Sequence, residues 1–236
     1  VWEDATTKYG FGHRRTYLLG KGLDSVMNYP FKNAVLDFVK GKPAQQAMNE
    51  ILSICEHYPA PALNTALNFL STHDTERALT VIADEPANGR GREWQSGRNV
   101  SGEAYEEGML RLRMAYAIIY TLPGLPCLYY GDEIGMQGYR DPFNRGYYCW
   151  DSHEERLKPV LAQLAQLRHS CEAFRTGALR VLRAEGGVLH YQRVGATETA
   201  EIIVNRSEHI IVEPLASGKH TEVNPMGFTI VVEENG

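Results

Sequence analysis

The chain has 236 residues, of which 43% are hydrophobic and 22% are charged, and its formal net charge is -5 at pH 7. This composition is typical of a globular protein that has enough chain to bury a core. A mildly acidic balance with no cluster of Lys and Arg argues against nucleic acid and against an anionic membrane surface as partners. We therefore expect no nucleic-acid partner and no membrane partner.

Strand-like and helix-like segments alternate from about residue 23 to residue 175. The apolar runs 23–29 and 66–71 predict short strands. The run 125–130 is apolar at every position and is closed by Gly131, which predicts a buried parallel strand. Helical crossovers between such strands are typical of α/β proteins.

Three segments carry the spacing of apolar residues that predicts a helix. The first opens at Pro43 and runs to Pro59, the second runs from a Ser101 N-cap to about Leu122, and the last opens at Pro159. The polar, glycine-rich stretch 84–100 predicts a long loop, and loops of that length are often functional.

After Gly177 the sequence pattern changes to short β-rich runs without a helical period. They predict a small antiparallel domain and a boundary near residues 176–178. The runs cover residues 181–193, 200–205, 209–213 and 227–232. We therefore expect two domains, residues 1–177 and residues 178–236.

The motif 71–77 places four ionisable side chains directly after an apolar strand. In α/β folds, ligands and catalytic groups lie at the carboxyl ends of parallel strands, so His73 and Asp74 are candidate site residues. A capping Asp beside a hydrogen-bonded His at a helix start is an equal alternative. The histidines show no zinc-ligand spacing with a nearby Cys, so we expect no metal site.

A second motif, in residues 124–145, strengthens the functional interpretation of the motif 71–77. The segment 124–136, followed by Asp-Pro-Phe-Asn-Arg at 141–145 and then by Trp150, resembles the end of the barrel in the α-amylase family of glycoside hydrolases. Within that family it is most similar to the neopullulanase, cyclomaltodextrinase and maltogenic amylase branch. Segments 28–31, 69–77 and 167–177 resemble the same branch in the same order.

The resemblance implies an α/β fold, a (β/α)8 TIM barrel followed by a small β domain. Such a barrel needs about 250 residues. We expect this chain to hold the C-terminal half, from the end of strand five to helix eight, and then a β-sandwich-like domain. The chain begins at Val1 and its first methionine is Met27. By the resemblance, the general-acid Glu precedes Val1 and the nucleophilic Asp lies further upstream, so we expect a fragment that lacks both.

The resemblance also implies roles for five residues. Asp74 corresponds to the family's third carboxylate, which binds the distorted glucosyl ring and favours the positively charged transition state. His73 corresponds to its hydrogen-bonding neighbour, although Thr72 stands where the family usually has Asn. Asp141 and Arg145 correspond to the pair that holds the next sugar, with a simple surface ion pair as the alternative. Trp2 corresponds to an aromatic residue beyond the scissile bond, with an exposed indole as the alternative.

The resemblance implies an α-glucan hydrolase that cleaves α-1,4 and, as a second class, α-1,6 bonds with retention. Two alternatives remain open: a transglycosylase or sugar isomerase of the same family, and a non-catalytic fragment or carbohydrate-binding homologue. We expect no cofactor; calcium occurs in parts of the family, but no acidic cluster here fixes it. The expected partner is an α-glucan. A homodimer of the full-length protein stays open, and the resemblance favours a cytoplasmic location.

Overall fold

A computed structural model of the chain describes residues 8–9, 12–13, 17–19 and 22–235. The first elements are two short paired strands, β1 (Lys8–Tyr9) and β2 (Gly12–His13). Val1 and Trp2 lie outside the described residues, so the role of Trp2 stays a prediction.

The helical part contains short parallel strands. β3 (Leu67–Asn68) pairs in parallel with β4 (Leu125–Pro126), and Met27 forms a single parallel bridge to Leu67. The predicted strand 23–29 is thus reduced to a bridge at its end. The order Met27, β3, β4 gives three parallel segments whose carboxyl ends point to the same edge.

Helix α1 (Tyr29–Lys40) was not predicted from the sequence. Pro30 looked like the end of a strand, but it occupies the first turn of this helix, where a missing N–H costs nothing. The Asn28 side chain caps the helix by accepting a hydrogen bond from the Phe31 N–H at 3.2 Å. Gly41 ends it with a φ of +131°.

The three predicted helices are confirmed with small changes. Helix α2 (Ala44–His57) follows Pro43, α6 (Gly102–Thr121) follows Ser101, and α7 (Leu157–Ser170) begins two residues before Pro159. The Ser101 side chain makes no capping hydrogen bond. Short helices α3 (Ala60–Thr65) and α8 (Ala173–Thr176) complete this part. In the part of the chain that the structure describes, no helix is long and apolar enough to cross a membrane.

The prediction that 125–130 forms a buried strand was wrong. Only Leu125 and Pro126 pair as strand, and Leu125, Leu128 and Tyr130 are 45%, 36% and 41% exposed. Among the described residues, β4 has a strand neighbour on the β3 side alone. The edge of β4 away from β3 therefore has no strand partner in the described part of the chain, at the place where a barrel would have a further strand.

Six antiparallel strands follow α8. Four form one sheet in the order β10-β7-β6-β5 and two form a separate hairpin. The predicted run 181–193 is two strands joined at Gly186 and Gly187. The sheet strands are β5 (Ala178–Glu185), β6 (Val188–Val194), β7 (Glu198–Asn205) and β10 (Gly227–Glu234), and the hairpin strands are β8 (Ile211–Pro214) and β9 (His220–Val223).

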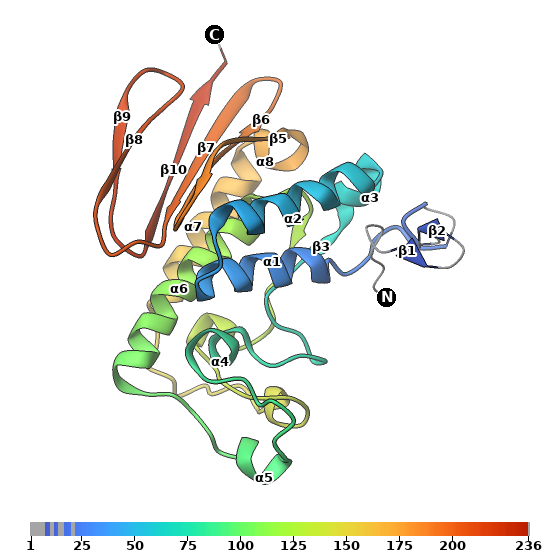
Figure 1. Ribbon diagram of the computed structural model, residues 1–236, viewed down its shortest axis with the longest axis vertical. Helices are drawn as coiled ribbons and strands as arrows, with labels where there is room; N and C mark the ends of the chain where they lie inside the picture. The colour runs from blue at the N-terminus through green and yellow to red at the C-terminus, as the bar shows by residue number, and fades with distance from the viewer. Residues whose placement is uncertain (1–7, 10–11, 14–16, 20–21, 236) are drawn as a thin grey trace.

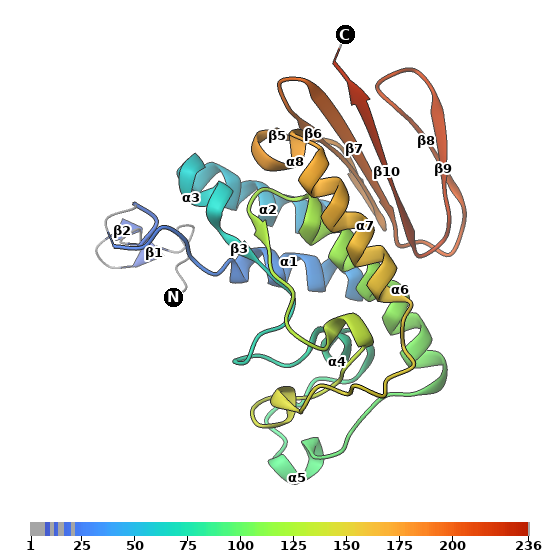
Figure 2. The same ribbon diagram turned by 180° about the vertical axis from the view of Figure 1, so that it is seen from behind.

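The sheet lies between the helices and the hairpin (Figures 1 and 2). Tyr191 and Ile202 on one face belong to the same hydrophobic core as the helices, whereas Ile203 on the other face packs with Leu215 and Val223 of the hairpin side. The buried guanidinium of Arg193 donates to the carbonyl oxygens of Thr121 and Gly177, at 2.7 and 2.8 Å. One core thus runs through both parts of the chain.

The loops that follow β3 and β4 lie at the end of the molecule opposite the sheet (Figures 1 and 2). They carry the short helices α4 (Ala78–Ala83) and α5 (Arg92–Gln95) and the 3-10 turns η1 (Asp132–Ile134) and η2 (Phe143–Arg145).

Candidate functional site

Two loops from neighbouring parallel strands meet and bring four predicted residues together. His73 Nε2 lies 3.2 Å from Asp74 Oδ1. Arg145 lies between two carboxylates, 2.8 Å from Asp141 and 3.8 Å from Asp74. The four side chains are between 46% and 60% exposed, so their polar atoms are open to a ligand. Trp2, the fifth predicted residue, lies outside the described residues.

Two threonines shape the turn that carries His73 and Asp74. The Thr72 hydroxyl accepts a hydrogen bond from the Asp74 N–H at 3.1 Å, and the Thr75 hydroxyl accepts one from the Thr72 N–H at 3.3 Å. Side-chain oxygens of this kind stabilise turns by replacing backbone acceptors. Thr72 therefore has a local structural role.

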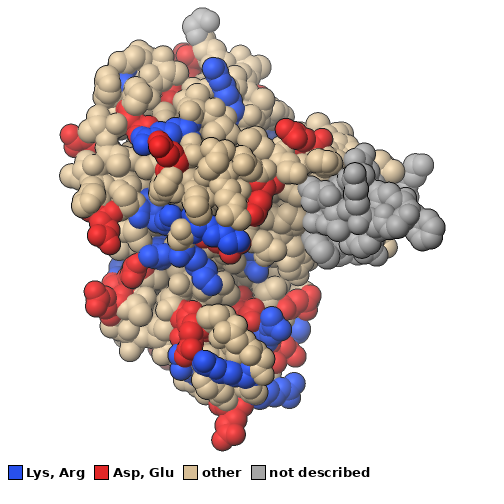
Figure 3. Space-filling view, in the orientation of Figure 1, with Lys and Arg blue, Asp and Glu red and all other residues tan. Residues whose placement is uncertain are grey.

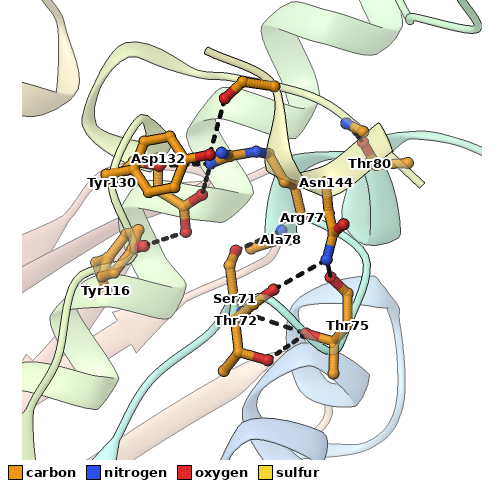
Figure 4. Close-up of polar contacts among 12 residues, drawn as sticks. Ser71, Thr72, Thr75, Arg77, Ala78, Thr80, Tyr116, Tyr130, Asp132 and Asn144 are labelled. Carbon is orange, nitrogen blue, oxygen red and sulfur yellow. Dashed lines mark hydrogen bonds and ion pairs between the residues drawn. The ribbon is translucent and has the colours of Figure 1, made fainter. Parts of the chain in front are cut away.

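A buried ion pair beneath the loops was missed from the sequence. Arg77 Nη1 lies 3.1 Å from Asp132 Oδ1, and the two side chains are 0% and 1% exposed (Figure 4). Arg77 also donates to the Tyr130 carbonyl oxygen at 2.6 Å, and the Tyr116 hydroxyl donates to Asp132 at 2.6 Å. Burial raises the pKa of Tyr116 well above its usual range, which keeps this donor protonated.

A signal for this pair was present in the sequence. Arg77 and Asp132 each follow one of two adjacent predicted strands, and opposite charges after neighbouring parallel strands reach the same edge. The guanidinium carbon of Arg77 also lies 4.7 and 4.8 Å from the ring centres of Tyr129 and Tyr130. The pair thus fastens the loop after β3 to the loop after β4.

The predicted loop 84–100 is ordered around Trp94. The guanidinium carbons of Arg90 and Arg98 lie 4.3 and 4.4 Å from its ring centre, and Arg98 also pairs with Asp84 at 2.8 Å. In Figure 3 basic and acidic side chains alternate at this lower end of the molecule, around the region of α5. The indole of Trp94 is therefore engaged with its own loop.

The described residues hold no group of three or more His, Cys, Asp or Glu side chains arranged to bind a metal ion. The side chains of His73, Asp74, Asp141 and Arg145 are instead suited to hydrogen bonding with a ligand. Carboxylates accept hydrogen bonds, and an imidazole or guanidinium donates them. A ligand with many hydroxyl groups needs both kinds of partner, because each hydroxyl donates and accepts.

Comparison with protein families matches residues 8–177 to the family described as the catalytic domain of alpha amylase. An amylopullulanase of Thermoanaerobacter thermohydrosulfuricus is 34% identical over 192 residues, which are 75% of this chain and 12% of that protein. A cyclomaltodextrinase of Geobacillus thermopakistaniensis is 30% identical over 221 residues, 91% of this chain and 32% of that protein.

Among solved structures, the ligand-free cyclic alpha-maltosyl-(1→6)-maltose hydrolase from Arthrobacter globiformis matches with a TM-score of 0.78 and 26% identity. The match covers 93% of this chain and 46% of that one. The chain thus spans a third or less of these two curated relatives and about half of this solved structure.

Proposed function

Because the chain belongs to the α-amylase family, we propose that it is the C-terminal part of an α-glucan hydrolase. The proposed reaction is retaining cleavage of α-1,4-glucosidic bonds, with α-1,6 bonds as a second class. The observation that carries the proposal is the meeting of His73, Asp74, Asp141 and Arg145 at the carboxyl ends of parallel strands.

Asp74 binds hydroxyls of the glucosyl ring at the cleavage point, and its negative charge favours the oxocarbenium-like transition state. His73 donates a hydrogen bond to the same ring. Asp141 and Arg145 share the vicinal hydroxyls of the next sugar, because a carboxylate accepts from one hydroxyl while a guanidinium donates to its neighbour. The Arg145 contact with Asp74 joins the two sugar positions.

A retaining glycosidase needs two carboxyl groups about 5 Å apart, one as nucleophile and one as acid. We assign both to sequence that precedes Val1 in the full-length protein. In this proposal residues 1–177 are the second half of the catalytic barrel and residues 178–236 are a β domain. The open edge at β4 and the 46% coverage of the solved relative support this organisation.

The names of the relatives support the substrate class. They are an amylopullulanase, a cyclomaltodextrinase and a cyclic maltosyl-maltose hydrolase, all named for α-glucans. The proposed partner of this chain is accordingly an α-glucan oligosaccharide or polysaccharide.

The test is an assay of the full-length protein on maltohexaose, with the anomer of the first product followed by NMR. We expect the α-anomer. The Asp74→Asn variant should lower kcat by at least about 100-fold, because it removes a charge that stabilises the transition state. Asp37→Asn, a partly exposed carboxylate on α1, is the matched control and should retain activity. Release of the β-anomer, or no hydrolysis of any α-glucan, would contradict the proposal.

A further inference from the structure

Asn144 is a fully buried residue that joins the two loops of the site. It lies in η2 beside Arg145 and has no exposed surface. Its side-chain nitrogen donates to the carbonyl oxygens of Thr72 at 3.2 Å and Thr75 at 2.8 Å (Figure 4). It also donates to the carbonyl oxygen of His73 at 2.8 Å. One amide group thus serves three carbonyls of the turn that carries His73 and Asp74.

The orientation of this amide follows from its surroundings. Turning it over would place Oδ1, an acceptor, against three other acceptors, whereas the observed orientation directs the two N–H groups at the three carbonyls, with one hydrogen shared between two of them. Backbone carbonyls away from water need such partners, and the turn 72–75, which lies outside any helix or sheet ladder, has only a long backbone hydrogen bond of its own, from the Thr75 N–H to the Thr72 carbonyl at 3.4 Å. Asn144 therefore supports the turn from outside it, in addition to the hydroxyl contacts of Thr72 and Thr75 within it.

The same short turn η2 contacts the site from two sides. Asn144 holds the backbone of the turn 72–75 from the buried side, and its neighbour Arg145 meets the Asp74 carboxylate from the open side. Asp141 is joined to the arrangement through its 2.8 Å contact with Arg145. A shift of η2 would move all of these contacts together.

We propose that Asn144 is a positioning residue of the site, which fixes the turn bearing His73 and Asp74 relative to the Asp141–Arg145 pair. This rests on the proposed function, in which those four side chains hold adjacent sugars. Asn144 touches no substrate itself. Its effect is on turnover because transition-state stabilisation needs charges held in place, and a displacement of about 1 Å costs on the order of 100-fold in rate.

Asn68 on β3 provides a matched control. It is also fully buried, and its amide nitrogen donates to the Pro123 carbonyl oxygen at 2.7 Å, while its amide oxygen accepts from Asn28 at 3.0 Å. Replacing either Asn by Asp keeps the size of the side chain and removes the amide donor. The two variants therefore cause comparable local damage, but only one of them adjoins the turn 72–75.

In the full-length protein we expect N144D and N68D both to lower the Tm. In the folded protein at saturating maltohexaose, N144D should lower kcat by about 100-fold, and N68D should keep the wild-type kcat. Asn144→Ser removes the amide without adding a charge and should change kcat in the same direction. A wild-type kcat in N144D and N144S, or an equal loss in N68D, would overturn the assignment.

A second readout does not depend on catalysis. The carbonyl ¹³C chemical shifts of Thr72, His73 and Thr75 should change in N144D and N144S and stay in place in N68D, because hydrogen bonding alters these carbons directly. If the wild-type protein hydrolyses no α-glucan, the proposed function fails while these shifts still decide the role of Asn144. Unchanged carbonyl shifts in N144D and N144S would refute it.

Discussion

Arg77 and Asp132 carry opposite charges at a depth where neither side chain is more than 1% exposed. Two charges taken out of water are expensive, and they are tolerated because each compensates the other and further donors or acceptors surround them. Here the Tyr116 hydroxyl donates to Asp132 and the Tyr130 carbonyl accepts from Arg77 Nη1, while Nε and Nη2 of Arg77 are buried without a hydrogen-bond partner. The pair sets the relation between the loops after β3 and β4.

Replacing Asp132 by Asn should destabilise the protein strongly. The substitution leaves the Arg77 charge buried without a counter-charge, and breaking a buried pair in this way costs about 3–5 kcal/mol. Urea unfolding of both proteins measures the difference. Glu107→Gln breaks a partly exposed pair with Arg111 on α6 and should cost less than about 1 kcal/mol. Equal losses in the two variants would contradict the importance of burial.

Residues of the site differ in how far the sequence predicts them. His73, Asp74, Asp141 and Arg145 stand in two recognisable motifs, and their meeting follows from the parallel strands before them. The contacts of Arg77 and Asn144 join positions that lie 55 and about 70 residues apart. The two motifs indicate that the charges of Arg77 and Asp132 can meet, but no local pattern encodes which carbonyl oxygens Arg77 and Asn144 reach, so those partners appear only in the folded chain.

The start of α7 is fastened to α6 through Glu154. The Arg156 side chain lies 2.9 Å from Glu154 Oε1 and also contacts Glu106, and the Tyr105 hydroxyl donates to Glu154 at 3.1 Å. Hydrogen bonds from Arg156 hold the pKa of Glu154 at about 2, below its ordinary value of 4.5. The charged carboxylate is thus favoured in the folded state.

This lowered pKa predicts a pH-dependent contribution to stability. A carboxyl group whose pKa falls on folding stabilises the protein above its unfolded pKa, and the contribution is lost as the pH falls toward the folded value. Wild-type protein should therefore be more stable than Glu154→Gln above pH 4.5, and the gap should close toward pH 2. Thermal unfolding across that range measures it. Glu155→Gln, at a neighbouring carboxylate that is 75% exposed, is the control and should change the stability by less than about 1 kcal/mol.

Helices with a clear spacing of apolar residues in their own sequence were predicted well. Elements whose form depends on contacts with other segments were not. Helix α6 has 20 residues, and its start and end were correctly predicted. Helix α1 was missed because its Pro30 is equally compatible with the end of a strand. The run 125–130 was taken as buried because all its residues are apolar, but burial depends on which strand lies alongside.

At the scale of the whole molecule, the open side of β4 presents apolar side chains to water. Leu125 and Leu128 are exposed there, and the described residues supply no strand beyond β4. An uncovered, apolar sheet edge is a template for pairing with another chain. In the proposed full-length barrel this edge is covered.

The chain of residues 1–236 alone should associate in solution and should not hydrolyse maltohexaose. Sedimentation equilibrium measures the association, and Leu125→Lys should shift it toward monomer because a charge on the edge opposes pairing. Leu110→Lys, at an exposed leucine on α6, should leave it unchanged. A wild-type chain that is monomeric at all concentrations, or one that turns over substrate, would contradict this prediction.

The alternation of strands and helices, and the change of pattern after Gly177, predicted helices α2, α6 and α7 and the antiparallel strands that follow them. The shared core was not predicted, because it arises between segments far apart in the chain. Tyr191 on β6 contacts the Thr121 hydroxyl of α6 at 2.6 Å, deep inside that core. Such contacts depend on the complete fold.

The shared core has a consequence for how this protein can change over generations. The inner face of the sheet packs against the helices, so the sheet cannot be exchanged independently of them. Exchanging residues 178–236 for the matching part of a distant relative would place foreign side chains against Thr121 and the rest of α6. Recombination at the boundary near residue 177 would therefore succeed only between parents whose two surfaces have diverged little, so the two parts are expected to be inherited together.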